Sequence, residues 1–185
     1  MTKFILHGGV TSRPCQSNDN YYKEIVNSVD EPRILLVYFA ITEDRWLEVS
    51  DEHKKLFLER AGDKKIEFVI ASKDTAEFIK QIQGNNIIFI RGGDTPMLQE
   101  ALEKVPDLKK RIQGKVVAGA SAGAIVLAKY YYDNDYNKIF EGLNIIPVKL
   151  ITHSSVENEN KRKELEAYSE NLPVYAIPET EFIIL

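Results

Sequence analysis

The chain has 185 residues, of which 44% are hydrophobic and 28% are charged, as expected of one globular domain over residues 1–185. Its net charge of -4 argues against nucleic acid as a partner, because phosphate binding needs a basic surface. No apolar run approaches the ~20 residues of a membrane-spanning helix, so we expect no membrane partner.

Eight short apolar runs alternate along the chain with longer amphipathic segments, and each run is predicted to form a β-strand. Residues 33–39 (RILLVYF) are apolar almost throughout, which is typical of a strand covered on both faces of a parallel sheet. The expected strands are 3–7, 33–39, 65–71, 86–90, 115–118, 149–152, 173–177 and 182–185.

The segments between these runs carry helix signals. Gly62 is a stop signal, Asp74 is placed to cap a helix, and Thr95 is placed to cap another whose first residue is Pro96. The expected helices are 42–61, 75–82, one that begins after residue 95, 122–130 and 161–169, and the expected loops are 11–20 and 132–138.

The alternation of strands and helices predicts an α/β fold with a mostly parallel sheet and helices on both of its faces. Ligands of such sheets bind beyond the carboxyl ends of the strands. His7, Arg91, Ser121 and His153 all stand at such ends. The sequence therefore predicts a functional site at this edge of the sheet.

The strongest chemical signal is the pentapeptide at 119–123 (GASAG), between an expected strand and an expected helix. A nucleophile elbow needs this arrangement, because its tight turn exposes a serine hydroxyl while small neighbours let strand and helix approach. The first helical turn adds free N–H groups and partial positive charge. A turn without chemistry and a phosphate-binding turn are alternatives, but the strand–turn–helix context favours Ser121 as a nucleophile.

A second glycine-rich turn, at 91–95 (RGGDT), also follows a strand and opens a helix. Its N–H groups are suited to hold an anion or a developing oxyanion. The Gly93 and Ala122 amides would then form an oxyanion hole. Taken alone, the turn is better explained by helix capping through Asp94 or Thr95. The oxyanion interpretation is favoured only because the same chain also contains the serine turn.

A serine nucleophile needs a neighbouring base, and the chain has three histidines. His53 lies in a charged helix and is expected to be solvated. His7 ends the first strand, where a structural role and a pocket-lining role fit equally well. His153 ends a later strand before two serines, which makes it the best-placed base for Ser121.

A catalytic triad also needs an acid that orients the imidazole. Asp133 and Asp135 lie on a polar loop and are expected to be solvated, whereas Glu179 follows a strand. A rigid strand end is the better position for an orienting group, so Glu179 is preferred. Three scattered histidines and one cysteine form no metal ligand set, and we expect neither a metal nor a cofactor.

At these residues the sequence resembles the peptidase E and cyanophycinase family of serine peptidases. The family's two-glycine turn, serine elbow and histidine strand end have counterparts at 92–95 (GGDT), 119–124 (GASAGA) and 152–155 (THSS). The resemblance also covers 142–143 (GL) and 177–179 (IPE), so it spans roughly the whole chain in order.

The resemblance implies a three-layer α/β/α, flavodoxin-like domain related to class I glutamine amidotransferases, with serine in place of their cysteine nucleophile. It implies Ser121 as the nucleophile and His153 as the base. It also implies oxyanion donors at Gly93 and Ala122, with Gly92 beside them.

The resemblance leaves the acid open. Cyanophycinase-like members have a glutamate that matches Glu179, whereas peptidase E has an aspartate that would fall near Asp135, and we expect Glu179. An arginine thought to read an aspartyl side chain in peptidase E aligns with Asn158, which puts that specificity in doubt. The chain ends at Leu185, before the further strands of most relatives, so we expect a short branch or a trimmed C-terminus.

We therefore expect a serine peptidase that hydrolyses a small peptide, dipeptidase-like, with aspartyl-X peptides among the candidates. The alternatives are a catalytically silent ligand-binding or regulatory member of the same fold and a general acyl hydrolase or esterase. The single cysteine, Cys15, and an N-terminal apolar run too short for a signal peptide predict a cytoplasmic protein. A monomer and a homodimer are both compatible with the sequence.

Overall fold

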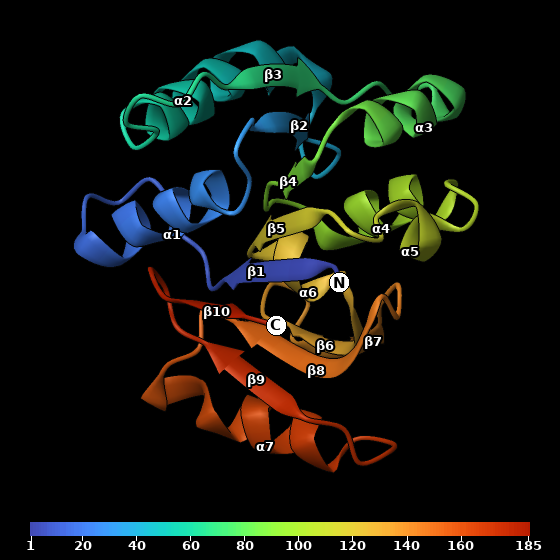
Figure 1. Ribbon diagram of the computed structural model, residues 1–185. Helices are drawn as coiled ribbons and strands as arrows, with labels where there is room; N and C mark the ends of the chain where they lie inside the picture. The colour runs from blue at the N-terminus through green and yellow to red at the C-terminus, as the bar shows by residue number, and fades with distance from the viewer.

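The computed structural model describes residues 1–185 and contains a larger and a smaller β-sheet (Figure 1). The larger sheet has six strands in the order β10-β1-β5-β4-β2-β3. Its strands are parallel except β10, which pairs antiparallel with β1. Their bounds are β1 (Lys3–His7), β2 (Arg33–Val37), β3 (Glu67–Ile70), β4 (Ile87–Ile90), β5 (Val116–Ala120) and β10 (Phe182–Ile184).

The smaller sheet has four strands in the order β7-β6-β8-β9. Strand β8 is parallel to β6 and to β9, whereas β7 is antiparallel to β6. Their bounds are β6 (Ala128–Asp133), β7 (Lys138–Glu141), β8 (Ile146–Thr152) and β9 (Val174–Ile177). The expected mostly parallel α/β fold is confirmed, but its strands divide between two sheets.

Helices cover both faces of the larger sheet. The chain crosses the sheet in one direction from β1 to β2 and β3, and then in the opposite direction from β3 to β4 and β5. Because such connections are right-handed, α1 and α2 cover one face of the sheet, and α3, α4 and α5 cover the other (Figure 1). Helix α7 packs on the smaller sheet. The bounds are α1 (Gln16–Asn27), α2 (Trp46–Leu58), α3 (Thr75–Gly84), α4 (Thr95–Glu103), α5 (Leu108–Arg111), α6 (Ala122–Ile125) and α7 (Glu159–Ala167). None of these helices has the length and apolar character needed to cross a membrane.

Several segments differ from the expectation: strand β7 was not expected, and Asp133, expected to be solvated on a loop at 132–138, is buried at the end of β6, and two further segments need a physical reason. The expected helix 122–130 is a single turn, α6, followed by β6, because three successive tyrosines with high strand propensity pair with β7 and β8. The segment 11–20 is not all loop, since α1 begins at Gln16. The apolar residues that anchor α1, among them Tyr21 and Tyr22, lie beyond the polar stretch that suggested a loop.

The helix caps follow the sequence in one case and not in the other. Asp74 caps α3 as expected, with its carboxylate accepting a hydrogen bond from the Glu77 N–H. Thr95 is not the cap of α4, because Asp94 accepts the Met97 N–H at 2.7 Å and Thr95 is already helical. A carboxylate is also the better partner for the positive end of the helix dipole.

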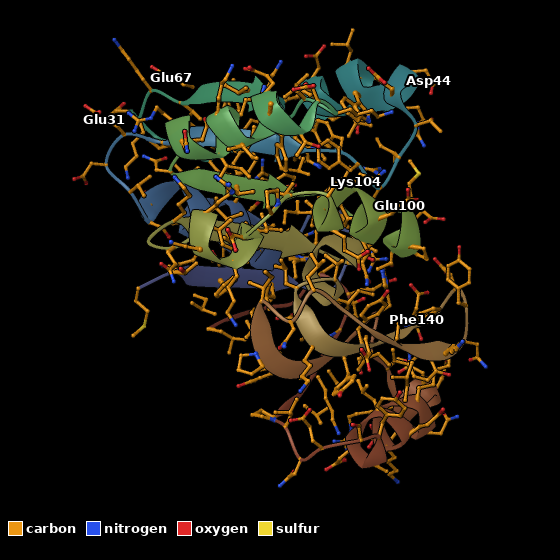
Figure 2. The ribbon with its side chains drawn as sticks, turned by 90° about the vertical axis from the view of Figure 1, so that its right-hand side faces the viewer. Glu31, Asp44, Glu67, Glu100, Lys104 and Phe140 are labelled. Atoms are coloured by element: carbon orange, nitrogen blue, oxygen red, sulfur yellow. The ribbon has the colours of Figure 1, made fainter.

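Burial of apolar side chains holds the larger sheet together. Residues 34–37 of β2 are fully buried, as expected of a strand covered on both faces. Charged side chains such as Glu31 and Glu67 project into solvent, and Glu100 of α4 forms an exposed ion pair with Lys104 at the end of that helix (Figure 2). Exposed pairs contribute less than about 1 kcal/mol each, so the apolar core is the main source of stability.

The turn between β5 and α6 is closely packed against its neighbours. A Cβ atom on Gly119 would lie 2.3 Å from the Gly123 carbonyl oxygen, and a Cβ atom on Gly123 would lie 2.1 Å from the Ile90 oxygen. These are backbone atoms that cannot rotate away. The expected reason for small residues on either side of Ser121 is therefore confirmed, and the glycines fix the position of the turn against β4.

Gly123→Ala should lower the free energy of unfolding by about 1–3 kcal/mol, because the added methyl group overpacks a backbone contact. Gly84→Ala is the matched control: it adds the same methyl group where no atom lies within 4 Å. The control should be neutral or stabilise by less than about 1 kcal/mol. Urea unfolding of both variants measures the difference, and equal midpoints would refute the packing argument.

Candidate active site

Ser121 occupies a strained turn at the carboxyl end of β5. Its φ of 52° and ψ of -118° lie outside the regions that non-glycine residues normally adopt. The Ser121 N–H donates to the His7 carbonyl oxygen at 3.0 Å, and α6 begins at the next residue. The turn thus has the strand–turn–helix geometry that a nucleophile elbow requires.

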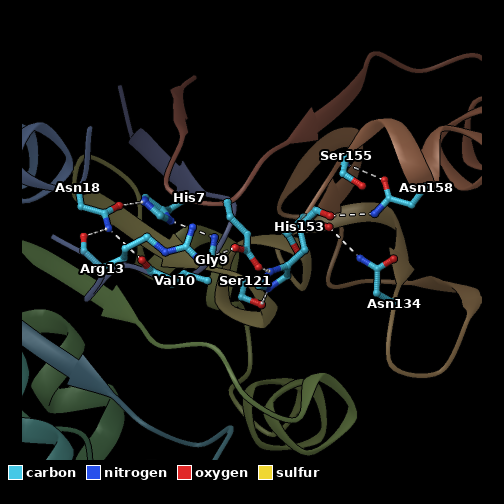
Figure 3. Close-up of polar contacts among 12 residues, drawn as sticks. His7, Gly9, Val10, Arg13, Asn18, Ser121, Asn134, His153, Ser155 and Asn158 are labelled. Atoms are coloured by element: carbon cyan, nitrogen blue, oxygen red, sulfur yellow. Dashed lines mark hydrogen bonds and ion pairs between the residues drawn. The ribbon is translucent and has the colours of Figure 1, made fainter. Parts of the chain in front are cut away.

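The structure brings Ser121 and His153 together. Ser121 Oγ lies 2.8 Å from His153 Nε2 (Figure 3). His153 follows β8 with a φ of 51°, and its N–H donates to the Gly8 oxygen. Its ring packs against Gly9, where a Cβ atom would lie 2.2 Å from the imidazole Cε1. The loop after β1 therefore fixes the imidazole from one side.

The other imidazole nitrogen contacts Glu179. His153 Nδ1 lies 3.1 Å from Glu179 Oε1, and the second carboxylate oxygen of Glu179 accepts from Arg13 Nη2 at 2.9 Å. The hydrogen bond from His153, and then that from Arg13, lower the pKa of Glu179 below 4.5, although partial desolvation opposes them. Glu179 is therefore an anion at neutral pH, as a group that orients an imidazole needs to be.

Asp135 makes no hydrogen bond with His153. It lies on the turn between β6 and β7, where its backbone N–H donates to Asp133. Asp133 and Asp135 border a small hollow that Ser121 and His153 also line. Both imidazole nitrogens already have partners, so Glu179 is the carboxylate that the structure brings to the ring.

The three expected oxyanion donors lie next to the serine turn. A Cβ atom on Gly92 would lie 2.8 Å from Ser121 Cβ and 3.5 Å from Ala122 N, so Gly92 faces the turn directly. Gly93 has a φ of 146° and packs on the Ala40 carbonyl group. The N–H groups of Gly92, Gly93 and Ala122 donate to no protein acceptor, which leaves them free for an anionic ligand.

His7 has the structural role that the sequence left open. It is fully buried; its Nδ1 accepts from the Gly9 N–H, and its Nε2 lies 2.8 Å from Asn18 Oδ1. The Asn18 amide in turn donates to the carbonyl oxygens of Val10 and Arg13 (Figure 3). Sequence reasoning missed this network. It shapes the loop after β1, whose Gly9 packs against His153 and whose Arg13 bonds to Glu179.

The expectation of a solvated His53 is wrong. The side chain is 6% exposed, and its Nδ1 lies 3.1 Å from the Tyr38 hydroxyl oxygen. Burial, together with the charge of Arg91, lowers the pKa of His53 to about 4, so the ring is neutral near pH 7. The four-residue spacing of Val49, His53 and Phe57, all buried, is the sequence signal that places His53 on the apolar face of α2.

A cleft of about 300 Å³ opens beside Ser121. The loop at 9–12 and His153 form one part of its lining, and α2 contributes Glu52, His53 and Leu56. The turn at 91–93 also lines the cleft. The carboxyl ends of β1, β4 and β5 thus meet at one cleft, as expected of a parallel sheet.

Residues 4–185 match Peptidase family S51. The chain belongs to this family. Its members are serine peptidases, and the chain is accordingly a serine-type peptidase. No curated protein matches the sequence.

Two solved structures share the fold of this S51 peptidase. A peptidase from an acI-B1 Actinobacterium superposes with a TM-score of 0.68 at 20% identity, over 100% of this chain and 83% of the other. A peptidase E protein from Listeria monocytogenes EGD-e superposes with a TM-score of 0.68 at 16% identity, over 100% of this chain and 98% of the other. At these identities, the likeness shows a shared α/β architecture.

Glu179→Gln should destabilise the S51 peptidase at pH 7 by at most about 1 kcal/mol, because its ion pairs are half exposed. The lowered pKa of Glu179 means that this stabilisation is present above pH 4.5 and is lost as the pH falls through the lowered value. The difference between wild type and variant should therefore vanish on acidification.

Urea unfolding between pH 7 and pH 3 measures this difference. Glu181→Gln is the matched control. Glu181 lies in the same turn, but its carboxylate makes no ion pair with a basic residue. A Glu179→Gln difference that stays constant over the whole range would contradict the assignment of the carboxylate as an ionised partner of His153 and Arg13.

Proposed function

We propose that this S51 peptidase hydrolyses small peptides through an acyl-enzyme formed on Ser121. The observation that carries the proposal is the 2.8 Å hydrogen bond between Ser121 Oγ and His153 Nε2. Glu179 at the opposite ring nitrogen completes the arrangement that activates a serine hydroxyl. We assign these three residues as nucleophile, base and orienting acid.

In acylation, Ser121 Oγ attacks the scissile carbonyl carbon while His153 Nε2 takes the hydroxyl proton. Glu179 keeps the remaining proton on Nδ1, so that Nε2 is the free base, and its negative charge stabilises the imidazolium. His153 then returns the proton to the leaving amine as the C–N bond breaks. Water, deprotonated by the same Nε2, cleaves the ester and regenerates Ser121.

The negative oxygen of the tetrahedral intermediate needs hydrogen-bond donors that are already in place. We propose the N–H groups of Ala122 and Gly93, with Gly92 beside them, for this role. Support comes from their lack of protein acceptors and from the close approach of Gly92 to Ser121. The start of α6 adds the partial positive charge of its first turn.

The size of the cleft supports a small substrate. Its volume of about 300 Å³ is at the lower end of the range for small-molecule sites. A short peptide, such as a dipeptide, suits this space better than a folded protein does.

The free Cys15 supports a reducing compartment, so we propose that the reaction takes place in the cytoplasm.

A fluorophosphonate probe should label the wild-type protein on Ser121, because the probe reacts with a serine activated by a base. Ser121→Ala should abolish both labelling and peptide hydrolysis. Ser12→Ala is the matched control: it removes a hydroxyl from the lining of the same cleft and should keep both. Intact-protein mass spectrometry and a dipeptide library digest provide the two measurements.

Full turnover by Ser121→Ala would refute the proposal. A wild type that is neither labelled nor active, yet is stabilised by a small ligand, would instead show a silent ligand-binding protein. Hydrolysis of p-nitrophenyl esters without any peptide cleavage would show a general esterase.

Glu179→Gln should lower kcat by about 10²–10⁴-fold, because the amide no longer holds the Nδ1 proton or stabilises the imidazolium. Asp135→Asn should change kcat by less than about threefold, since the Asp135 carboxylate makes no hydrogen bond with His153. Steady-state kinetics on the same dipeptide compare the two variants. The reverse ranking would assign the orienting role to Asp135.

A further inference from the structure

We propose that Arg13 is a positioning residue for the peptidase reaction, and that it holds the Glu179 carboxylate against the imidazole of His153. The inference rests on the proposed function, because it takes Glu179 as the acid of the triad. Arg13 lies on the loop that follows β1 of the larger sheet, whereas Glu179 follows β9 of the smaller sheet. A residue next to one sheet thus orients a member of the triad that comes from the other.

The Glu179 side chain has few other restraints. It is 40% exposed, and its three rotatable bonds must all be fixed before the carboxylate can orient a ring. One carboxylate oxygen lies 3.1 Å from His153 Nδ1, and the other accepts from Arg13 Nη2 at 2.9 Å. A single bond to a partly exposed ring leaves the carboxylate free to swing into solvent. The second bond, from Arg13, prevents this movement.

A buried chain of hydrogen bonds sets the position of Arg13 (Figure 3). The Gly9 N–H donates to His7 Nδ1, so the ring proton of His7 is on Nε2, which lies 2.8 Å from Asn18 Oδ1. The Asn18 amide group donates to the carbonyl oxygens of Val10 and Arg13, at 2.9 and 2.7 Å. His7 is fully buried and Asn18 is 2% exposed, so water does not compete for these bonds.

The same loop is also tied to the turn that carries Glu179. The Gly8 N–H donates to the Glu181 carbonyl oxygen at 2.9 Å, and the Thr180 N–H donates to the Gly9 oxygen at 3.0 Å. These bonds fix the backbone next to Glu179, while the arginine fixes the end of its side chain. The loop therefore restrains the acid of the triad at both ends.

The position of Arg13 separates it from the substrate site. Residues 9–12 of its loop line the cleft beside Ser121, but Arg13 does not, and it does not line the small hollow beside Asp135 either. An arginine that binds substrate would raise KM when it is lost. A positioning residue should lower kcat and leave KM nearly unchanged.

A pure charge effect of Arg13 predicts the opposite pH dependence. The acid limb of kcat/KM reports protonation of the base in the free enzyme. If Arg13 holds Glu179 in place, its loss takes the anion away from the imidazolium and moves the acid limb to lower pH, as Glu179→Gln should do. If Arg13 only neutralises a carboxylate that stays in place, its loss strengthens the anion and moves the limb to higher pH. The other titratable groups around the ring and its two hollows are the same in all variants: His7, Glu52, His53, Arg91, Asp133 and Asp135.

Steady-state kinetics of Arg13→Met, on a dipeptide that wild type cleaves, test the role. The value of kcat should fall about 5- to 50-fold, with KM changed less than about twofold, because the carboxylate reaches the ring in only a fraction of the molecules. Arg13→Lys keeps the charge on a single donor group and should restore part of the loss. Arg162→Met is the matched control: it breaks an exposed ion pair with Glu159 on α7 and should change kcat less than about twofold.

Asn18→Ala tests the link between the buried network and Arg13. It should lower kcat, and Arg13→Met should then have a much smaller effect in this background than in wild type, because the arginine is already displaced. An undiminished effect of Arg13→Met would overturn the role of the network. If Asn18→Ala does not fold, the Arg13 variants still decide the inference, because they change only an exposed side chain.

An unchanged kcat in Arg13→Met, or an acid limb that moves to higher pH, would overturn the inference while the peptidase function stands. A spectroscopic measurement does not depend on turnover. The Nδ1 proton of a histidine that donates to a carboxylate gives a separate downfield signal in the proton NMR spectrum. This signal of His153 should be absent from Glu179→Gln, and weaker or shifted upfield in Arg13→Met.

A downfield signal that is identical in Arg13→Met and wild type would overturn the inference, whether or not the protein cleaves peptides. Its absence from wild type would overturn it as well, because the carboxylate would then not be held on the ring. A signal that responds to Arg13→Met in a protein without peptide hydrolysis would keep the positioning of Glu179 and refute the peptidase proposal instead.

Discussion

The hydrogen bond between Ser121 and His153 joins the two sheets of the molecule, and the arrangement of the site depends on it. Ser121 follows β5 of the larger sheet, whereas His153 follows β8 of the smaller one. Their 2.8 Å contact requires the carboxyl ends of both strands to meet at one point. The loop after β1 holds them there, because Gly8 accepts the His153 N–H and Gly9 packs against the imidazole ring.

Unusual backbone conformations are concentrated at this junction. Ser121 and His153 both have positive φ values, as do Gly9, Val10 and Thr180 around them. In the four non-glycine residues such conformations cost about 1–3 kcal/mol each and persist only where the surrounding contacts enforce them, whereas Gly9 adopts its positive φ without this cost. Here those contacts come from backbone hydrogen bonds and from glycines whose missing side chains leave room. The core of the sheets therefore provides the stability that keeps the site strained and in place.

The sequence predicted most of the fold and the members of the site that stand at strand ends. The apolar runs gave the strands, and the position of Ser121 between a strand and a helix gave the turn. Strands β6 and β7 were missed. The tyrosines of β6 directly follow a helix signal, and the pairing of β6 with β7 and β8, which a single sequence does not show, decides the structure. Arg13 could not be found either, since its partner Glu179 lies 166 residues further along the chain.

The origin of the three residues in two sheets has a mechanical consequence. His153 and Glu179 follow β8 and β9, which are paired neighbours, and both are also tied to the loop after β1 of the larger sheet, through Gly8 and Arg13. A movement of one sheet against the other would therefore have to break these ties before it could separate the serine oxygen from the imidazole.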